Sequence, residues 1–122
     1  MEEGNQILLV DDDAFNVLAL QTLLQQFNQV ADVASSGRQA IEAIQRRCTS
    51  RVPMYGLILM DYNMPGMDGP RCTFKIREII NTMPNVGRPR ICCVTANHEK
   101  EFKDRALGVG MDEFISKPIF KL

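Results

Sequence analysis

The sequence predicts an open, doubly wound α/β fold in which a parallel five-stranded sheet carries helices on both faces. Short runs that are apolar at every position predict buried strands, and stretches with helical spacing lie between them. The two kinds of segment alternate along the chain. Since parallel neighbours need crossover connections, this alternation favours a parallel sheet covered by helices.

Three runs are apolar throughout, as strands buried on both faces require: residues 7–10, 57–60 and 91–94. Residues 113–116 form a weaker candidate. A fifth run, residues 30–34, is interrupted by Asp32 and is therefore expected at an edge of the sheet.

Apolar residues with helical spacing predict four helices between these strands. The first covers residues 14–27, where one stripe recurs at i, i+3, i+7 and i+10: Val17, Leu20, Leu24 and Phe27. The other three are indicated by Ala40, Ile41 and Ile44 after Ser36-Gly37, by Ile76, Ile79, Ile80 and Met83, and by Phe102 and Ala106. Two longer connections, residues 49–55 and 82–89, are expected to be solvated linkers.

Length and composition favour one domain over residues 1–122, since 45% of the residues are hydrophobic. The formal net charge of -1 gives no reason to expect nucleic acid or an anionic membrane as the main partner. No apolar run approaches the ~20 residues of a membrane helix. The four cysteines form no C-x-x-C pair, which favours reduced, packed thiols. A cytoplasmic segment is expected, and membrane attachment elsewhere in a longer chain stays open.

Chemically active side chains follow the predicted strands at the edge where an open parallel sheet binds ligands. The first strand is followed by Asp11, Asp12 and Asp13, and the third by Asp61. The last two strands lead to Thr95 and Lys117. Acids, a hydroxyl and an amine are thus expected to converge at one edge.

Carboxylates crowded at one edge repel one another unless a cation neutralises them. Hard oxygen ligands without a nearby His or Cys favour Mg²⁺, or Mn²⁺ in its place. Asp11 and Asp12 are placed as the chelating pair. Asp61 stands alone before an open turn with Pro65 and is the expected nucleophile, which would form an acyl phosphate. Lys117 and Thr95 could hold the phosphoryl oxygens.

Four motifs in this order resemble the receiver domain of two-component response regulators. They are Asp11-Asp12 after ILLV, DYNMPGMDG from Asp61, Thr95-Ala96, and GMDEFISKP from Gly110. The match spans about residues 6–120 and looks most like receivers attached to hybrid histidine kinases. It implies a flavodoxin-like sheet of strand order 2-1-3-4-5.

The resemblance also implies roles. Asp61 is the phosphoacceptor, and Asn63 adds its backbone carbonyl to the Mg²⁺ ligands Asp11, Asp12 and Asp61. Thr95 and Lys117 contact the phosphoryl group, Thr95 and Phe114 form a switch, and the Lys117-Pro118 bond is cis. The partner is a histidine kinase or histidine phosphotransfer protein, and the domain catalyses its own phosphorylation and dephosphorylation without being a metabolic enzyme. The parent chain would be a hybrid histidine kinase.

Two departures from the family pattern stand out. Asp13 replaces the Asn usual in hybrid-type receivers and is either a helix cap or an added charge near the metal. Only Pro118 to Leu122 follow the last strand, so the last helix is expected to be missing. Because the family pairs through that face, a receiver–receiver dimer and the stability are expected to be affected.

Two other functions stay open. A haloacid-dehalogenase-type phosphatase also uses an Asp nucleophile and Mg²⁺, but its signature after Asp11 and Asp13 would need Thr or Val where Phe15 stands. A degenerate receiver that only docks partners would not need the complete set of site residues. His98, the one histidine, is expected to be a solvated helix residue.

Overall fold

Strands and helices alternate strictly along the part of the chain that the structure, a computed structural model, describes, which is residues 3–117. The strands are β1 (Ile7–Val10), β2 (Ala31–Ala34), β3 (Leu57–Asp61), β4 (Arg90–Thr95) and β5 (Glu113–Ser116). The helices are α1 (Ala14–Gln25), α2 (Gly37–Cys48), α3 (Gly69–Asn81) and α4 (Lys100–Gly108).

All neighbouring strands pair in parallel, in the order β2-β1-β3-β4-β5. The predicted fold class and strand order are therefore confirmed. β2 and β5 are the two edges of the sheet, and β3 lies at its centre. The carboxyl ends of the strands share one edge, which brings the residues after β1, β3, β4 and β5 together.

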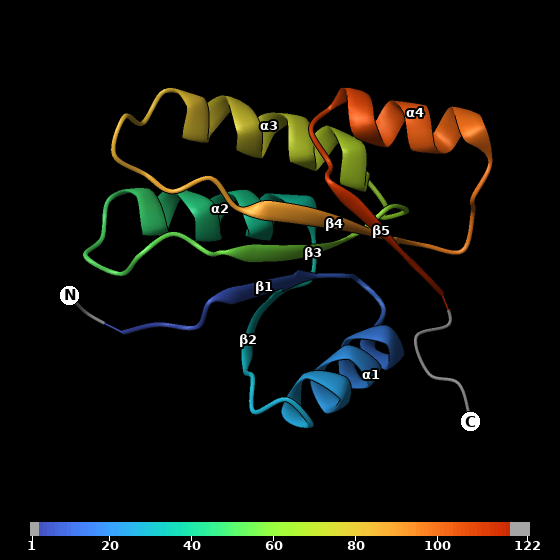
Figure 1. Ribbon diagram of the computed structural model, residues 1–122, viewed down its shortest axis with the longest axis horizontal. Coiled ribbons are helices and arrows are strands. Elements are labelled where there is room, and N and C mark those ends of the chain that lie inside the picture. Colours follow the sequence, from blue (N-terminus) through green and yellow to red (C-terminus); the bar gives the residue numbers. More distant parts are fainter. Residues whose placement is uncertain (1–2, 118–122) are drawn as a thin grey trace.

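Helices cover the sheet on both faces, with α2 and α3 on one face and α1 on the other (Figure 1). The alternation of side chains along β1 divides the core accordingly. Leu8 and Val10 belong to the cluster beneath α2 and α3, whereas Ile7 and Leu9 belong to the cluster that includes Leu20 of α1. Strands buried on both faces explain why the predicted runs are apolar throughout.

The first helix is shorter than predicted, because it ends at Gln25 and leaves Phe27 outside with 68% of its surface exposed. Asn28 adopts a positive φ of 57°. The N–H groups of Asn28 and Gln29 donate to the carbonyls of Gln25 and Leu24, both at 3.0 Å. This Schellman-type arrangement stops the helix before the apolar stripe is complete.

Two other apolar residues lie outside the elements that were predicted to contain them. β2 begins at Ala31, so Val30 lies outside it and is 65% exposed. α3 ends at Asn81, where the Thr82 hydroxyl bonds the carbonyl of Ile79 at 2.7 Å, and Met83 lies in the following loop. A Pro two residues after the cap prevents the helix from continuing.

Asp32 interrupts the apolar pattern of β2 because it is hydrogen-bonded there. Its carboxylate accepts from the Tyr55 hydroxyl at 2.6 Å, from Asn5 at 2.9 Å and from Arg47 at 3.1 Å. Burial acts to raise the pKa of Asp32, but these donors outweigh it and lower the pKa below the ordinary 3.8. The edge position predicted for this strand is confirmed.

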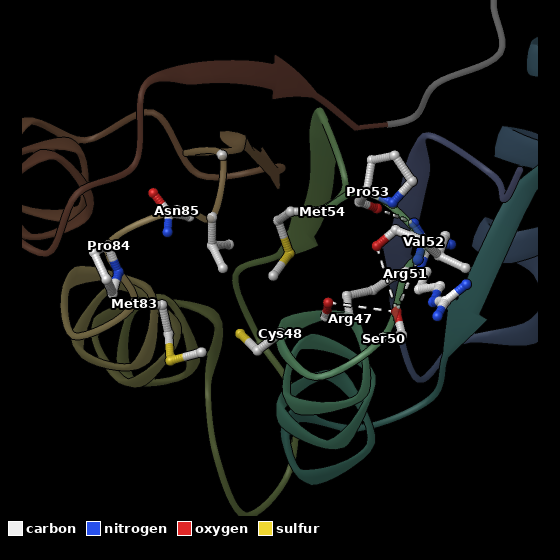
Figure 2. Close-up of a pocket in the computed structure, with 12 residues that line it drawn as sticks. Arg47, Cys48, Ser50, Arg51, Val52, Pro53, Met54, Met83, Pro84 and Asn85 are labelled. Carbon is white, nitrogen blue, oxygen red and sulfur yellow. Dashed lines mark hydrogen bonds between the residues drawn. The ribbon is translucent and has the colours of Figure 1, made fainter. Parts of the chain in front are cut away.

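The two long connections border one cavity of about 480 Å³ (Figure 2). Arg51 and Met54 come from the connection before β3, and Met83 and Val86 from the connection before β4. Cys48, at the end of α2, also lines it. These segments precede the amino ends of their strands, so the cavity lies at the opposite edge of the sheet from Asp61.

All four cysteines are free thiols, and three of them are buried. Within residues 3–117, no helix has the length and apolar character needed to cross a membrane. The expectations about the last helix and about the Lys117-Pro118 bond concern residues 118–122, which lie outside the described residues.

Candidate phosphoryl-transfer site

The carboxyl edge of the sheet brings together the acids that the sequence indicated. Carboxylate oxygens of Asp11, Asp12 and Asp61 all lie within 4.8 Å of one another. Asp61 ends β3, while Asp11 and Asp12 directly follow β1, its neighbour in the sheet. Adjacent parallel strands ending in register therefore create the acidic cluster from residues 50 positions apart in the chain.

Asp11 is the most deeply buried of these acids, with only 1% of its surface exposed. Its Oδ1 accepts the N–H of Asp13 at 2.9 Å, and its own N–H donates to the carbonyl of Ala34 at 3.1 Å. Its Oδ2 is buried and has no hydrogen-bond partner within residues 3–117. A buried carboxylate oxygen without a donor is costly unless a cation approaches it, so the residues fit a divalent ion with hard oxygen ligands.

Asp61 is 3% exposed, and its Oδ1 accepts a 2.7 Å hydrogen bond from the Lys117 ammonium. Burial raises the pKa of Asp61 to about 6, and the charge of Asp11 acts in the same direction. Lys117 and the backbone N–H of Asn63 oppose this rise. Lys117 also lies 3.9 Å from Asp11 Oδ2, so a single cation faces two buried carboxylates.

Asp12 and Asp13 are exposed at the mouth of the cluster. Asp13 is the N-cap of α1 and accepts the N–H of Phe15 at 2.8 Å. The helix-cap alternative for Asp13 is therefore the one that the structure shows. This cap turns the chain away from the sheet directly after the acidic pair.

The Asp61 turn, residues 62–68, carries the chain from β3 into α3. The Tyr62 N–H donates to the carbonyl of Val94 at 3.1 Å, and the Gly69 N–H donates to the carbonyl of Tyr62 at 2.8 Å. A Cβ at Gly69 would lie 2.2 Å from the Asp61 carbonyl oxygen, so this approach requires glycine. Asn63 is exposed within the turn, and its role as a carbonyl ligand stays a prediction.

Thr95 ends β4 and is 3% exposed. Its hydroxyl accepts the N–H of Asn97 at 3.0 Å, and its carbonyl accepts the N–H of Lys117 at 3.0 Å. Phe114 of β5 is half-buried against the cluster beneath α2 and α3, with the Lys103 ammonium 5.5 Å from its ring centre. The switching roles of Thr95 and Phe114 are not tested by this arrangement.

His98 lies in the connection before α4, so the expectation of a helical position was wrong. Its Nε2 is 2.8 Å from the hydroxyl of Ser116, the residue before Lys117. The side chain is nevertheless exposed, as expected. The histidine therefore links the connection before α4 to the end of β5.

Contacts between the Asp61 turn and α4 were missed by the sequence reasoning. The Tyr62 and Phe102 rings pack 5.3 Å apart, and Arg105 donates to both carboxylate oxygens of Asp68 at 2.8 and 3.3 Å. Nothing in a single sequence pairs residues about 40 positions apart. Asp68 itself was detectable as a cap, because it precedes Gly69-Pro70 and accepts the N–H of Arg71 at 2.9 Å.

This geometry agrees with the comparison to known families. The family model described as "Response regulator receiver domain" matches residues 7–121. The chain belongs to the response regulator receiver domain family. Every part of the receiver site discussed above falls inside the matched range.

Relatives at the sequence level include histidine kinases, some of them described as hybrid signal transduction histidine kinases. Hybrid signal transduction histidine kinase B of Dictyostelium discoideum is 37% identical over 125 residues, covering 97% of this chain and 6% of that protein. Signal transduction histidine-protein kinase BarA of Escherichia coli K12 is 34% identical over 113 residues, covering 93% of this chain and 11% of that protein. The chain thus spans only a small part of these relatives.

Solved receiver structures match the fold. The receiver domain of the histidine kinase CKI1 from Arabidopsis thaliana, complexed with Mg²⁺, has a TM-score of 0.81 at 25% identity, covering 94% of this chain and 84% of that one. The same domain complexed with Mg²⁺ and BeF3⁻ has a TM-score of 0.76 at 26% identity, with 94% and 82% covered.

Proposed function

We propose that this receiver domain accepts a phosphoryl group on Asp61 from a phosphohistidine in a two-component or phosphorelay system. The observation that carries the proposal is the Asp11, Asp12 and Asp61 cluster within 4.8 Å, with the Lys117 ammonium 2.7 Å from Asp61. A buried carboxylate, neighbouring carboxylates that can hold a divalent cation, and an ammonium group beside them are the parts that phosphoryl transfer to a carboxylate needs.

Asp11, Asp12 and Asp61 would hold a divalent cation, with the carbonyl of Asn63 as a further ligand. Mg²⁺ is proposed because oxygen ligands favour it and because the CKI1 receiver binds it; Mn²⁺ is expected to substitute. When bound, the ion neutralises the crowded carboxylates and attracts phosphoryl oxygens. The Oδ2 of Asp11, which is buried and accepts no hydrogen bond within residues 3–117, supports this ligand set.

The chain's own residues would perform the transfer as follows. An Asp61 carboxylate oxygen attacks phosphorus, a new O–P bond forms, the N–P bond to the donor imidazole breaks, and the imidazole leaves with the electron pair. Lys117 moves its hydrogen bond from Asp61 to a phosphoryl oxygen. The Thr95 hydroxyl, which donates to the Asn97 carbonyl at 3.4 Å, would donate to another phosphoryl oxygen instead. The resulting movement of Thr95 is proposed to draw Phe114 inward.

The donor is proposed to be a histidine kinase or a histidine phosphotransfer protein. Phe15 and Leu18 are 84% and 61% exposed, one turn apart on α1, which starts directly after the acidic cluster. Two large apolar side chains beside a charged site indicate a docking surface for a partner with an apolar patch. The domain is proposed to act in the cytoplasm, where its four thiols would stay reduced.

Mass spectrometry after incubation with Mg²⁺ and a small acyl phosphate tests the proposal. We expect one added phosphoryl group in the wild-type protein, none in Asp61→Asn, and normal uptake in the exposed control Asp104→Asn. No uptake by the wild type would favour the docking-only alternative. Steady hydrolysis of unrelated phosphomonoesters would favour a phosphatase of the haloacid dehalogenase type.

A phosphohistidine donor separates docking from chemistry. Phe15→Ala with Leu18→Ala is expected to slow transfer from a phosphorylated histidine phosphotransfer domain by about tenfold while leaving uptake from the small acyl phosphate unchanged. A double variant that takes the phosphoryl group from the phosphotransfer domain as fast as the wild type does would exclude α1 as the docking surface.

A further inference from the structure

Arg77 of α3 donates three hydrogen bonds to backbone carbonyls that lie outside its own helix. Its Nη1 donates to the carbonyl of Pro89 at 2.6 Å, and its Nε and Nη2 donate to the carbonyl of Gly110 at 3.1 and 2.7 Å. Nη2 also donates to Asp112 Oδ2 at 2.9 Å. The side chain is only 9% exposed. One guanidinium therefore joins α3 to the segments that precede both β4 and β5.

Gly110 leaves room for the Arg77 side chain because it has no Cβ. Its φ is +102°, and a Cβ at this position would lie 3.1 Å from Cγ and Nε of Arg77. A larger residue would be strained and would press on Arg77. The local sequence thus permits a close approach between the turn before β5 and the middle of α3.

Asp112 connects the guanidinium to the pairing of β5 with β4. Its carboxylate accepts the N–H of Ile91 at 2.9 Å, and its own N–H donates to the carbonyl of Ile91 at 2.8 Å. The next residue, Glu113, is paired with Cys92. Asp112 is therefore fixed to β4 and to Arg77 at the point where the pairing of β5 begins.

β5 is a four-residue edge strand whose two ends are exposed. Its register depends on the backbone pairing with β4, on Phe114 and Ile115 in the core, and on the contacts at its start. The Arg90–Glu113 ion pair lies between side chains that are 61% and 59% exposed, so it contributes little. A slip of one residue would exchange the faces of Phe114 and Ile115, which pack into opposite core clusters.

The register of β5 decides where Lys117 lies. Lys117 follows β5 directly, and its ammonium reaches Asp61 Oδ1 at 2.7 Å. A one-residue slip would move the chain by about 3.3 Å, which is enough to break such a hydrogen bond. The other half of the pair is tied to the same helix, because the Gly69 N–H at the start of α3 bonds the carbonyl of Tyr62, next to Asp61, at 2.8 Å.

We infer that Arg77 is a positioning residue: by fixing Gly110 and Asp112 to α3, it sets the register of β5 and so places Lys117 against Asp61. The inference rests on the proposed function for its chemical consequence. Arg77 itself is hydrogen-bonded to neither Asp61 nor Lys117, since its hydrogen bonds go to the segments that precede β4 and β5.

Arg47 offers a matched control. It also donates to a proline carbonyl, that of Pro53 at 2.8 Å, and to a carboxylate, Asp32 at 3.1 Å, and its side chain is 11% exposed. These contacts lie at the β2 edge, away from β5. Arg77→Met and Arg47→Met therefore remove similar interactions, but only the first would affect Lys117.

The experiment measures the affinity for Mg²⁺ alone, the affinity for beryllofluoride at saturating Mg²⁺, and the rate of phosphoryl uptake from a small acyl phosphate. For Arg77→Met we expect beryllofluoride affinity and uptake to fall about tenfold, the effect of losing one hydrogen bond to a charged group. Mg²⁺ affinity should change less than about twofold, because its ligands lie after β1 and β3. Arg77→Lys should recover part of the loss, and Arg47→Met should show neither effect.

Equal losses of Mg²⁺ and beryllofluoride affinity in Arg77→Met would overturn the inference, since they would show a general structural defect, as would unchanged beryllofluoride affinity. If Arg77→Met does not fold, Asp112→Asn is measured instead and should show the same split. If the wild type binds no beryllofluoride and accepts no phosphoryl group, the proposed function fails. NMR hydrogen exchange then decides the inference: lost protection of the Lys117 amide in Arg77→Met or Asp112→Asn supports it, and full protection refutes it.

Discussion

At the scale of single residues, opposing electrostatic effects act on the pKa of Asp61. Asp61 is buried beside Asp11, and both effects raise its pKa, while the Lys117 ammonium counteracts them. The folded protein without metal therefore keeps an ionised Asp61 at neutral pH only at a cost in stability. A cation bound at this edge would remove this cost.

The pH dependence of stability follows from the pKa of about 6 for Asp61 against an ordinary value of 3.8. Between about pH 4 and pH 6 the folded metal-free protein binds more protons than the unfolded chain, so the free energy of unfolding contributed by Asp61 falls as pH rises. Asp61→Asn stays neutral and removes this cost. We expect the variant to gain on the order of 3 kcal/mol above about pH 6 and almost nothing below about pH 4.

Urea denaturation in the presence of a chelator at several pH values measures this difference. Asp104→Asn is the control, because its side chain is 58% exposed and lies outside the acidic cluster. A gain from Asp61→Asn that is the same at pH 4 and pH 7.5 would contradict the explanation by buried charge.

At the scale of elements, the start of α3 fixes the geometry of the Asp61 turn. The helix begins with an Asp68 cap and packs so closely on β3 that only glycine fits at its first position. Arg105 and Phe102 then attach α4 to the same turn through Asp68 and Tyr62. The turn is thus the meeting point of one strand and two helices.

Gly69→Ala is expected to destabilise the protein by about 2 kcal/mol, because its Cβ would overlap the Asp61 carbonyl oxygen at 2.2 Å and the backbone must shift. Gly108→Ala is the matched control. It lies at the exposed end of α4 with no atom within 4 Å of the added Cβ, so it should stabilise by about 0.5–1 kcal/mol. Chemical denaturation measures the stability of both variants. Equal changes in the free energy of unfolding would contradict a steric requirement for glycine at position 69.

At the scale of the whole molecule, the acidic cluster joins segments that are distant in sequence. Asp11 and Asp12 follow β1, whereas Asp61 ends β3, so an ion bound to them bridges two neighbouring strands of the sheet. Binding at such a bridge requires the folded sheet. Ligand affinity is therefore coupled to global stability.

Mg²⁺ is expected to raise the free energy of unfolding by about 2.7 kcal/mol at a concentration 100 times its Kd, and the Tm by several degrees. Asp11→Asn should abolish this gain, because it removes a carboxylate charge at the buried ligand. Asp104→Asn, outside the cluster, should retain it. Calorimetric scans with and without Mg²⁺ make the comparison, and a gain that persists in Asp11→Asn would place the ion elsewhere.

The sequence by itself determined the architecture and the identity of the converging residues. Strands buried on both faces must be apolar throughout, so runs such as residues 57–60 were recognisable, and alternation with helices required a parallel sheet. Parallel strands end at one edge, and this rule alone brought Asp11, Asp61 and Lys117 together. Local patterns are enough for these conclusions because they identify the strands, and the parallel arrangement then fixes the edge at which every strand ends.

Only the tertiary structure decided the boundaries and the supporting contacts. Phe27 fits the helical stripe, yet the chain turns at Asn28, whose left-handed conformation no periodicity reveals. The contacts of Arg77 with Gly110 and Asp112 join residues more than 30 positions apart. Such contacts depend on which elements pack together, and a single sequence carries no record of that packing. The acids could therefore be predicted from the sequence, while the network that positions Lys117 could not.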